Sequence, residues 1–236
     1  IKDVRQSKDL IAERKFKTIY FGGGTPSLAS TESIKHILDS IKDKFLFNEA
    51  EITLEMNPND VSGDRIDELL MAGINRISLG IQSYSNQELH ALGRNHDRQS
   101  AIKATQALVG INSTIDLIYG IEKQTPKSFT SNIERLIQSN INHLSLYQLT
   151  IEPNTIFYKK ELKLPDEEEI EEIEFIAKDL LEKNGYKQYE VSSWSKPGYE
   201  SQHNMNYWQF GDFLGVGPGS HSKISNEEGI IRFRKI

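Results

Sequence analysis

The chain has 236 residues, a net charge of −6 and no cysteine, with 37% hydrophobic and 26% charged residues. This composition predicts a soluble globular protein with a sizeable core, and it excludes disulfides and thiolate metal ligands among these residues. Without a Lys/Arg-rich tract, the chain is not expected to bind nucleic acid. No apolar run is long enough to span a bilayer and the first residues form no signal peptide, so we expect a cytoplasmic protein without a transmembrane segment.

The apolar residues alternate between a period of two and a period near 3.6, which predicts strands and helices in turn. The expected strands lie at 17–21, 51–56, 76–81, 113–119 and 143–149, with a further strand at 188–193. The expected helices have an apolar face from Ile34 to Phe45, run from about Asp64 to Gly73, and then lie at 86–92, at 98–108, from Pro126 onward and at 166–184. Because helices separate the first five strands, we expect parallel pairing with right-handed crossovers.

The expected strands have one aliphatic face and one face of small or polar side chains. In the strand at 76–81, Ile77 and Leu79 lie on one face while Ser78 and Gly80 lie on the other. A doubly wound sheet is apolar on both faces, and a closed eight-stranded barrel fills its lumen with bulky side chains. An antiparallel sheet with one wet face fits the alternation but not the helices. We therefore expect an α/β fold built on a partial, open barrel with a polar lumen.

Three glycines follow the first expected strand and lead into Thr25. Glycine permits positive φ and lets a ligand approach backbone N–H donors, although a tight turn would explain the same residues. In parallel barrels, ligands bind at the carboxyl ends of the strands. The residues expected at that edge are Gly23 to Thr25, Glu55 to Pro58, Gln82-Ser83, Asp116, Thr150 and Glu152, with Gly93-Arg94-Asn95-His96 between the third and fourth strands.

A carboxylate in the middle of a strand, such as Asp116, is costly to bury without a partner. A structural ion pair with Arg94 or Arg76 would satisfy it, and so would a ligand. Taken together, the residues at this edge offer N–H donors, two carboxylates, an amide and a guanidinium. Such a set suits a zwitterionic ligand that carries a hydroxyl-rich sugar.

Several short motifs along the chain carry a family resemblance. GGGTPS at 22–27, ExNP at 55–58, NRISLGIQS at 75–83, LGRNH at 92–96, IDLIYG at 115–120 and QT at 124–125 resemble, in order, the radical S-adenosylmethionine family of oxygen-independent coproporphyrinogen III oxidase. The resemblance covers nearly the whole chain. It implies a partial (β/α)6 barrel and a [4Fe–4S] cluster that cleaves S-adenosylmethionine to a 5′-deoxyadenosyl radical. It also implies that S-adenosylmethionine contacts Gly23, Gly24, Thr25, Glu55, Gln82, Arg94 and Asp116.

The last third of the chain is similar to the HemW-type heme chaperone branch of this family. The similarity lies in YxLTIExxT at 147–155, HNxxYW at 203–208 and GxGPGSHS at 215–222. It implies that the protein binds heme and passes it to an apo-hemoprotein, with His203 as the candidate heme ligand. A His hydrogen-bonded in a turn is the structural alternative.

Two other functions remain open at this point. One is the enzymatic reaction, oxidative decarboxylation of coproporphyrinogen III propionates to vinyl groups. The other is a barrel enzyme that uses the glycine loop for a sugar phosphate, although it leaves Glu55, Arg94 and HNxxYW unexplained. The family assignment divides the chain into a partial barrel at 1–155 and a C-terminal accessory region at 156–236. The family assignment is compatible with a peripheral membrane contact and does not indicate an oligomeric state.

Three departures from the family pattern stand out. The cysteine loop that binds the cluster follows a first strand in the family, whereas this chain has no cysteine and its first strand corresponds to the family's second. Either this homologue has lost the cluster or its ligands lie outside this chain. We expect the second, and we assign no metal ligand or catalytic residue within the chain. The stretch at 108–112 is shorter than expected, and Gly120-Ile121-Glu122 replaces the usual Gly-Leu-Pro.

Overall fold

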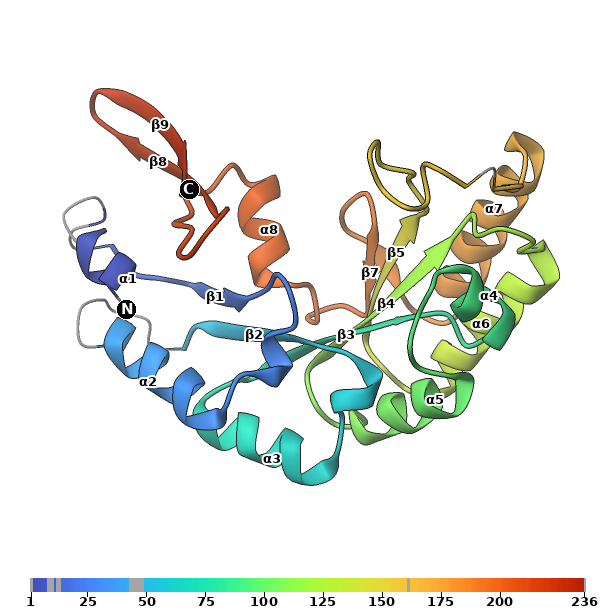
Figure 1. The fold of residues 1–236 in the computed structure, drawn as a ribbon, viewed down its shortest axis with the longest axis horizontal. Coiled ribbons are helices and arrows are strands. Elements are labelled where there is room, and N and C mark those ends of the chain that lie inside the picture. The colour runs from blue at the N-terminus through green and yellow to red at the C-terminus, as the bar shows by residue number, and fades with distance from the viewer. Residues whose placement is uncertain (1, 8–10, 12–13, 43–48, 161, 236) are drawn as a thin grey trace.

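The computed structural model describes residues 2–7, 11, 14–42, 49–160 and 162–235, and it is organised around a curved seven-stranded sheet (Figure 1). The strand order is β1-β2-β3-β4-β5-β7-β6. The parallel strands are β1 (Thr18–Phe21), β2 (Glu51–Met56), β3 (Arg76–Gln82), β4 (Ser113–Tyr119) and β5 (His143–Gln148). The antiparallel strands are β7 (Ser193–Ser195) and β6 (Lys187–Gln188). Within the described residues β1 and β6 do not pair with each other, so the barrel is open.

Helices follow the outer side of this arc (Figure 1). They are α2 (Thr31–Lys42), α3 (Gly63–Ala72), α4 (Asn86–Ala91), α5 (Arg98–Ala107), α6 (Pro126–Gln138) and α7 (Glu167–Lys183). The concave side carries α8 (Gln202–Trp208), while α1 (Lys2–Gln6) and a hairpin of β8 (His221–Asn226) and β9 (Gly229–Arg234) lie at the β1 end (Figure 1). Two short 3₁₀ turns, η2 (Pro26–Leu28) and η3 (Pro58–Asp60), follow β1 and β2. Within the described part of the chain, no helix is long and apolar enough to cross a membrane.

Local sequence sets the helix ends. The Ser62 side chain accepts from the Arg65 N–H at the start of α3, and Gly73 ends that helix with a φ of 108°. At the start of α6, Thr125 and Ser128 form a capping box and Pro126 occupies the first turn. These caps satisfy backbone groups that a helix end leaves without an intrahelical partner.

The two faces of the sheet differ as the sequence predicts. Leu54, Ile77, Leu79, Ile115 and Leu144 are fully buried in one core against the outer helices. Each such side chain contributes about 1.5–3 kcal/mol when buried. The opposite face carries the polar residues of every parallel strand, which line the concave side. The expected α/β fold, a partial open barrel with a polar lumen, is confirmed.

Two predicted elements need comment. The predicted strand at 188–193 is wrong, because β6 ends at Gln188, β7 begins at Ser193, and a turn connects them. The Tyr189 N–H donates to the Ser193 carbonyl at 3.2 Å and Gln188 Nε2 donates to the Val191 carbonyl at 2.9 Å. The turn lacks the Gly, Pro or Asn that marks most reversals. The predicted helix position Phe45 lies outside the described residues.

The region after residue 155 supplies β7 and β6 to the barrel sheet, where β7 pairs with β5. It also supplies α8 and the β8–β9 hairpin. The division into a barrel at 1–155 and an accessory region at 156–236 stays a prediction.

Candidate functional site

Glu55 is fixed near the carboxyl end of β2 by two donors from the β1 segment. The Gly23 N–H donates to Glu55 Oε2 at 3.1 Å, and the Tyr20 hydroxyl donates to Oε1 at 2.9 Å. Burial and the Glu55 charge raise the pKa of Tyr20, so its hydroxyl keeps its proton. A Cβ at Gly22 would lie 2.8 Å from the Tyr20 ring, which explains a glycine there. Gly23 and Gly24 have φ values of 80° and 66° and are exposed, so their backbone is open to a ligand.

Arg94 and Gln82 approach Gly80 at the end of β3. Arg94 Nη2 donates to the Gly80 carbonyl at 3.3 Å and to Asn57 Oδ1 at 3.2 Å. Gln82 has a φ of 71° and lies where the β3–β4 register shifts. A Cβ on Gly80 would lie 2.9 Å from Gln82 Nε2, so a side chain there would displace the amide. The bulge thus turns Gln82 toward Arg94.

The Arg94 guanidinium is short of partners. Its Nε is buried without a hydrogen-bond partner, and it forms no salt bridge with any described residue. Burial lowers the pKa of Arg94. Buried donors are nearly always satisfied, so an unpaired N–H on a guanidinium indicates a place for a carboxylate ligand.

Asp116 lies next to Ser78, whose hydroxyl donates to Asp116 Oδ2 at 3.1 Å. Burial and the charge of Glu55 raise the pKa of Asp116 to about 7, although the Ser145 and Ser78 hydroxyls and the Arg76 charge act to lower it. Among the described residues Asp116 pairs with neither Arg94 nor Arg76, so the ion-pair explanation is not what the structure shows. Asp116 is therefore held by the Ser78 and Ser145 hydroxyls and has no cationic partner among the described residues.

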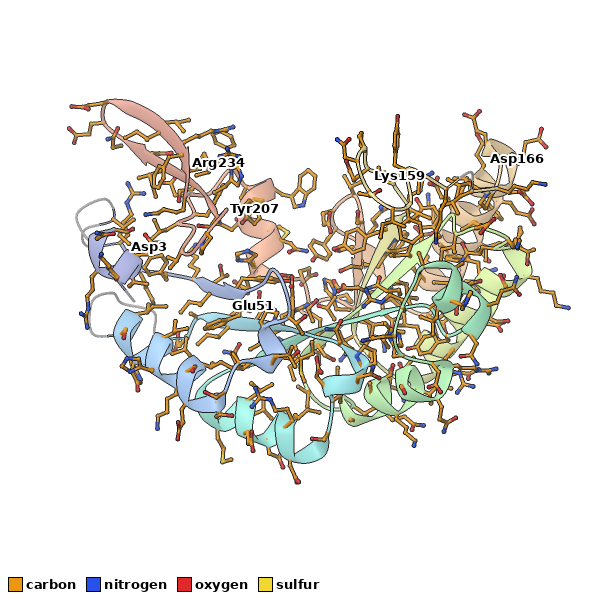
Figure 2. The ribbon with its side chains drawn as sticks, viewed as in Figure 1. Asp3, Glu51, Lys159, Asp166, Tyr207 and Arg234 are labelled. Atoms are coloured by element: carbon orange, nitrogen blue, oxygen red, sulfur yellow. The ribbon has the colours of Figure 1, made fainter. Side chains whose placement is uncertain are left out.

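Glu51 and Arg76 form a buried pair deeper in the lumen. Arg76 Nη1 lies 3.4 Å from Glu51 Oε2, and Arg76 Nη2 donates to Thr114 Oγ1 at 2.9 Å. Glu51 in turn accepts the backbone N–H groups of Gln202 and His203 at 3.2 and 3.1 Å. Figure 2 shows Glu51 on the α8 side of the sheet. The pair therefore anchors the first turn of α8 to β2 and β3.

His203 lies in that first turn of α8, and not in an isolated turn. Its Nδ1 is 3.0 Å from Thr18 Oγ1, its ring stacks on Tyr20 with centroids 4.7 Å apart, and the Tyr207 ring meets it edge-on at 5.2 Å. Burial lowers the pKa of His203 to about 4, so the imidazole is neutral at pH 7. None of the described residues forms a hydrogen bond with its Nε2.

Most of the predicted site residues converge. Gly23 and Glu55 are in contact, Arg94 and Gln82 meet at Gly80, and Glu55 and Asp116 are close enough for their charges to interact. Thr25 precedes η2 with no side-chain capping bond. The sequence reasoning missed Tyr20, which joins Glu55 to His203. The alternation of Thr18 and Tyr20 with apolar Ile19 and Phe21 would have placed both on the lumen face.

Comparison with known proteins adds a family. A model of the radical SAM superfamily matches residues 2–136. The chain is 43% identical over 222 residues to "Heme chaperone HemW" of Escherichia coli, which covers 92% of this chain and 59% of that protein. The Haemophilus influenzae protein of the same name is 42% identical over 238 residues, covering 99% of this chain and 62% of that protein. The chain thus spans about three fifths of the length of these relatives.

A more distant relative and a solved structure are consistent with this match. The mouse protein "Radical S-adenosyl methionine domain-containing protein 1, mitochondrial" is 34% identical over 95% of this chain and 52% of its own length. The structure of Escherichia coli coproporphyrinogen III oxidase, HemN, described as a radical SAM enzyme, superposes with a TM-score of 0.81 at 24% identity. That match covers 94% of this chain and 56% of HemN, and it shows a shared fold.

Proposed function

This chain belongs to the radical SAM superfamily, and from that membership we propose that it is part of a heme chaperone, which binds heme and transfers it to an apo-hemoprotein. The bacterial relatives named heme chaperones support this function. The single structural observation that carries it is that His203 is a neutral imidazole whose Nε2 no described residue engages. We include in the proposal the cytoplasmic location predicted from the sequence.

His203 has the properties of an axial heme ligand. When its Nδ1–H donates to Thr18 Oγ1 at 3.0 Å, the lone pair lies on Nε2, which no described residue engages. A fixed hydrogen bond on the other ring nitrogen orients a ligating imidazole. On the same helix, the Tyr207 and Trp208 side chains are 46% and 57% exposed, and they offer flat aromatic surface to a porphyrin.

We further propose that S-adenosylmethionine occupies the strand-end cluster. Arg94, with its unpartnered Nε, would hold the carboxylate. Glu55 and the glycine loop would hold the ammonium group, and Gln82 and Asp116 would accept from ribose hydroxyls. Gly23, Gly24 and Thr25 would line the methionine end of the site. When bound, this cofactor supplies the 5′-deoxyadenosyl group that defines the superfamily's chemistry.

The residues of this chain do not fit an iron–sulfur cluster. The 236 residues include no cysteine, and the described ones contain no group of three His, Cys, Asp or Glu side chains placed to hold a metal. The proposal therefore derives no step through a cluster from this chain. We expect the ligands of the iron–sulfur cluster to lie outside these residues.

Oxidative decarboxylation of coproporphyrinogen III is the alternative function, and an experiment must distinguish it from heme binding and transfer. The likeness to HemN is at 24% identity and concerns the fold, so it does not favour that reaction. We would titrate the full-length protein, with cluster reconstituted, with heme and assay decarboxylation in parallel. We expect stoichiometric heme binding, transfer to an apo-hemoprotein and no vinyl product. Turnover of coproporphyrinogen without stable heme binding would contradict the proposal.

The role of His203 has its own test. His203→Ala should change the Soret spectrum of bound heme, because the axial nitrogen is lost. His90→Ala is a matched control, since His90 is exposed on α4. An unchanged Soret spectrum in His203→Ala would show that another residue binds the iron.

A further inference from the structure

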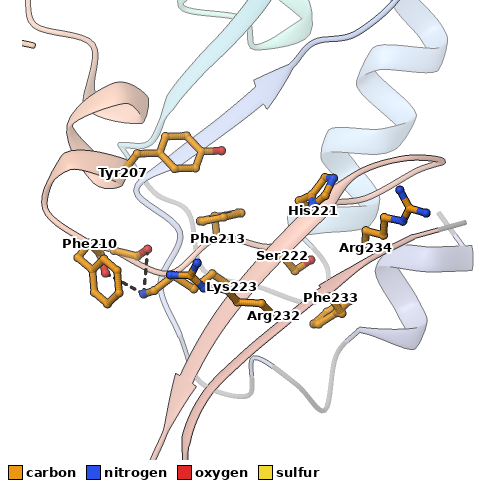
Figure 3. A pocket seen from close by; sticks show the side chains of 10 residues that line it. Tyr207, Phe210, Phe213, His221, Ser222, Lys223, Arg232, Phe233 and Arg234 are labelled. Carbon is orange, nitrogen blue, oxygen red and sulfur yellow. Dashed lines mark hydrogen bonds between the residues drawn. The ribbon is translucent and has the colours of Figure 1, made fainter. Parts of the chain in front are cut away.

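A cavity of about 500 Å³ lies between α8 and the β8–β9 hairpin (Figure 3). We call it the hairpin pocket, and its main lining residues are Tyr207, Phe213, His221, Lys223, Arg232 and Arg234. Its volume falls in the range of small-molecule sites. None of the predicted S-adenosylmethionine contacts lines it, whereas Tyr207, His221 and Ser222 belong to the HNxxYW and GxGPGSHS motifs.

The hairpin pocket is basic in a chain whose net charge is −6. None of the described residues that line it is acidic. Lys223 is already satisfied, since its Nζ lies 3.0 Å from Asp212 Oδ1 and 2.8 Å from the Phe210 carbonyl oxygen. Arg232 and Arg234 form no salt bridge with any residue that the structure describes, and Arg232 only approaches the Phe210 ring, at 5.9 Å. Two guanidinium groups therefore remain open to an anion.

The hairpin register places basic residues directly opposite one another. His221 pairs with Arg234, and Lys223 pairs with Arg232. Because these positions alternate by two, all four side chains lie on one face of the hairpin. Because Asp212 neutralises Lys223, the open positive charges on this face are those of Arg232 and Arg234. Two guanidinium groups on one face favour a ligand with more than one negative group.

Aromatic rings connect the hairpin pocket to His203. The Tyr207 ring lies 4.8 Å from the Phe213 ring and 5.2 Å from the His203 ring. Figure 3 shows Tyr207 and Phe213 on one side of the cavity, with His221 and Arg234 on the other. A flat ligand that contacts these rings would therefore have one end near His203 and the other near the arginines.

We propose that the hairpin pocket binds the carboxylate-bearing edge of the porphyrin, with Arg232 and Arg234 as partners of its propionates. Tyr207 and Phe213 contact the macrocycle. The assignment rests on the proposed heme-binding function and deepens it, because it names the part of the ligand that this second group of residues recognises. Guanidinium groups suit the purpose because they bind carboxylates through two parallel N–H donors.

The test compares three ligands on the full-length protein: heme, heme dimethyl ester and iron-free protoporphyrin IX. The wild type should prefer heme to its ester by about tenfold or more, since two charge-assisted contacts are lost in the ester. Arg232→Gln/Arg234→Gln should weaken heme binding by a similar factor and abolish that preference. Arg98→Gln/Lys103→Gln removes the same charge from exposed positions on α5 and should change neither.

Iron-free protoporphyrin IX separates this site from His203. Its binding should weaken in the arginine variant and stay unchanged in His203→Ala, because there is no iron to ligate. The ligand-free arginine variant should be as stable to heat as the wild type, because neither arginine forms a salt bridge with a described residue that the change would break. A lower Tm would mean that the arginines support the hairpin itself, and would contradict the proposal.

Different outcomes overturn different claims. If the wild type binds heme but the arginine variant binds it equally well, with the same preference over the ester, the hairpin pocket assignment is wrong and the chaperone function stands. If the wild type binds neither heme nor protoporphyrin IX, both fail. Partial rescue by Arg232→Lys/Arg234→Lys would support recognition by charge.

Discussion

Two groups of polar residues near the lumen differ in how their arginines are paired. In the paired group, Arg76 and Glu51 are 2% and 7% exposed and satisfy each other and the first turn of α8. In the unpaired group at the strand ends, Arg94 forms no ion pair with a described residue, and Asp116 is hydrogen-bonded to Ser78. A paired arginine and carboxylate fix the structure, whereas an unpaired guanidinium and a carboxyl with a raised pKa are typical of a binding site.

The largest expected effect concerns the paired group. Arg76→Met leaves Glu51 buried without its cation, so the free energy of unfolding should fall by about 3–5 kcal/mol in urea denaturation. Lys183→Met is the control, because Lys183 and Asp179 form an exposed pair whose loss should cost about 0.5 kcal/mol or less. Equal, small losses of unfolding free energy in both variants would show that the buried Arg76–Glu51 pair stabilises the fold no more than the exposed Lys183–Asp179 pair does.

A substitution in the unpaired group should change the affinity for S-adenosylmethionine and leave the stability of the fold nearly unchanged. Arg94→Lys replaces a planar fork with a point charge, so S-adenosylmethionine should bind about 10- to 100-fold more weakly in calorimetry on the full-length protein. The free energy of unfolding should change by about 1 kcal/mol or less, since among the described residues the Arg94 guanidinium hydrogen-bonds only to Asn57 and the Gly80 carbonyl. Arg98→Lys, on the surface of α5, is the matched control. Unchanged affinity would exclude Arg94 from the site.

The smallest effect is a pH dependence that Asp116 imposes. Its pKa is about 7 in the folded protein, against 3.8 as the ordinary value. The unfolded chain thus releases this proton first, so stability falls as the pH rises from about 4 to about 7 and is level above that. Asp116→Asn should remove the dependence and be more stable relative to wild type at pH 8 than at pH 4. A constant difference across this range would show that the carboxyl titrates normally.

The sheet could be predicted from the sequence because strands are marked by patterns of neighbouring residues. The alternation of Ile77 and Leu79 with Ser78 and Gly80 predicted an aliphatic outer face and a polar lumen, and burial follows that pattern. Positive φ at Gly23 and Gly24 agrees with the glycine loop. The strand-end residues could be assigned to the carboxyl edge of the sheet because parallel strands end at the same edge.

The remaining features depend on contacts between distant parts of the chain. Glu51 meets the backbone of His203 across 152 positions, and nothing near either residue indicates that α8 lies on the concave side. The register that opposes Lys223 to Arg232 follows from the turn at Asn226 to Gly229, which the motif reading did not address. Tyr20 contacts His203 across 183 positions of the chain, and no local pattern at residue 20 indicates that partner.

Tyr20 gives both proposed sites a common constraint on their evolution. Its hydroxyl donates to Glu55 and its ring stacks on His203, so one side chain contacts a residue of each proposed site. Phenylalanine at this position would keep the stacked ring and lose the hydroxyl, and an aliphatic residue would lose both. A substitution at position 20 would therefore be constrained by both proposed sites at once.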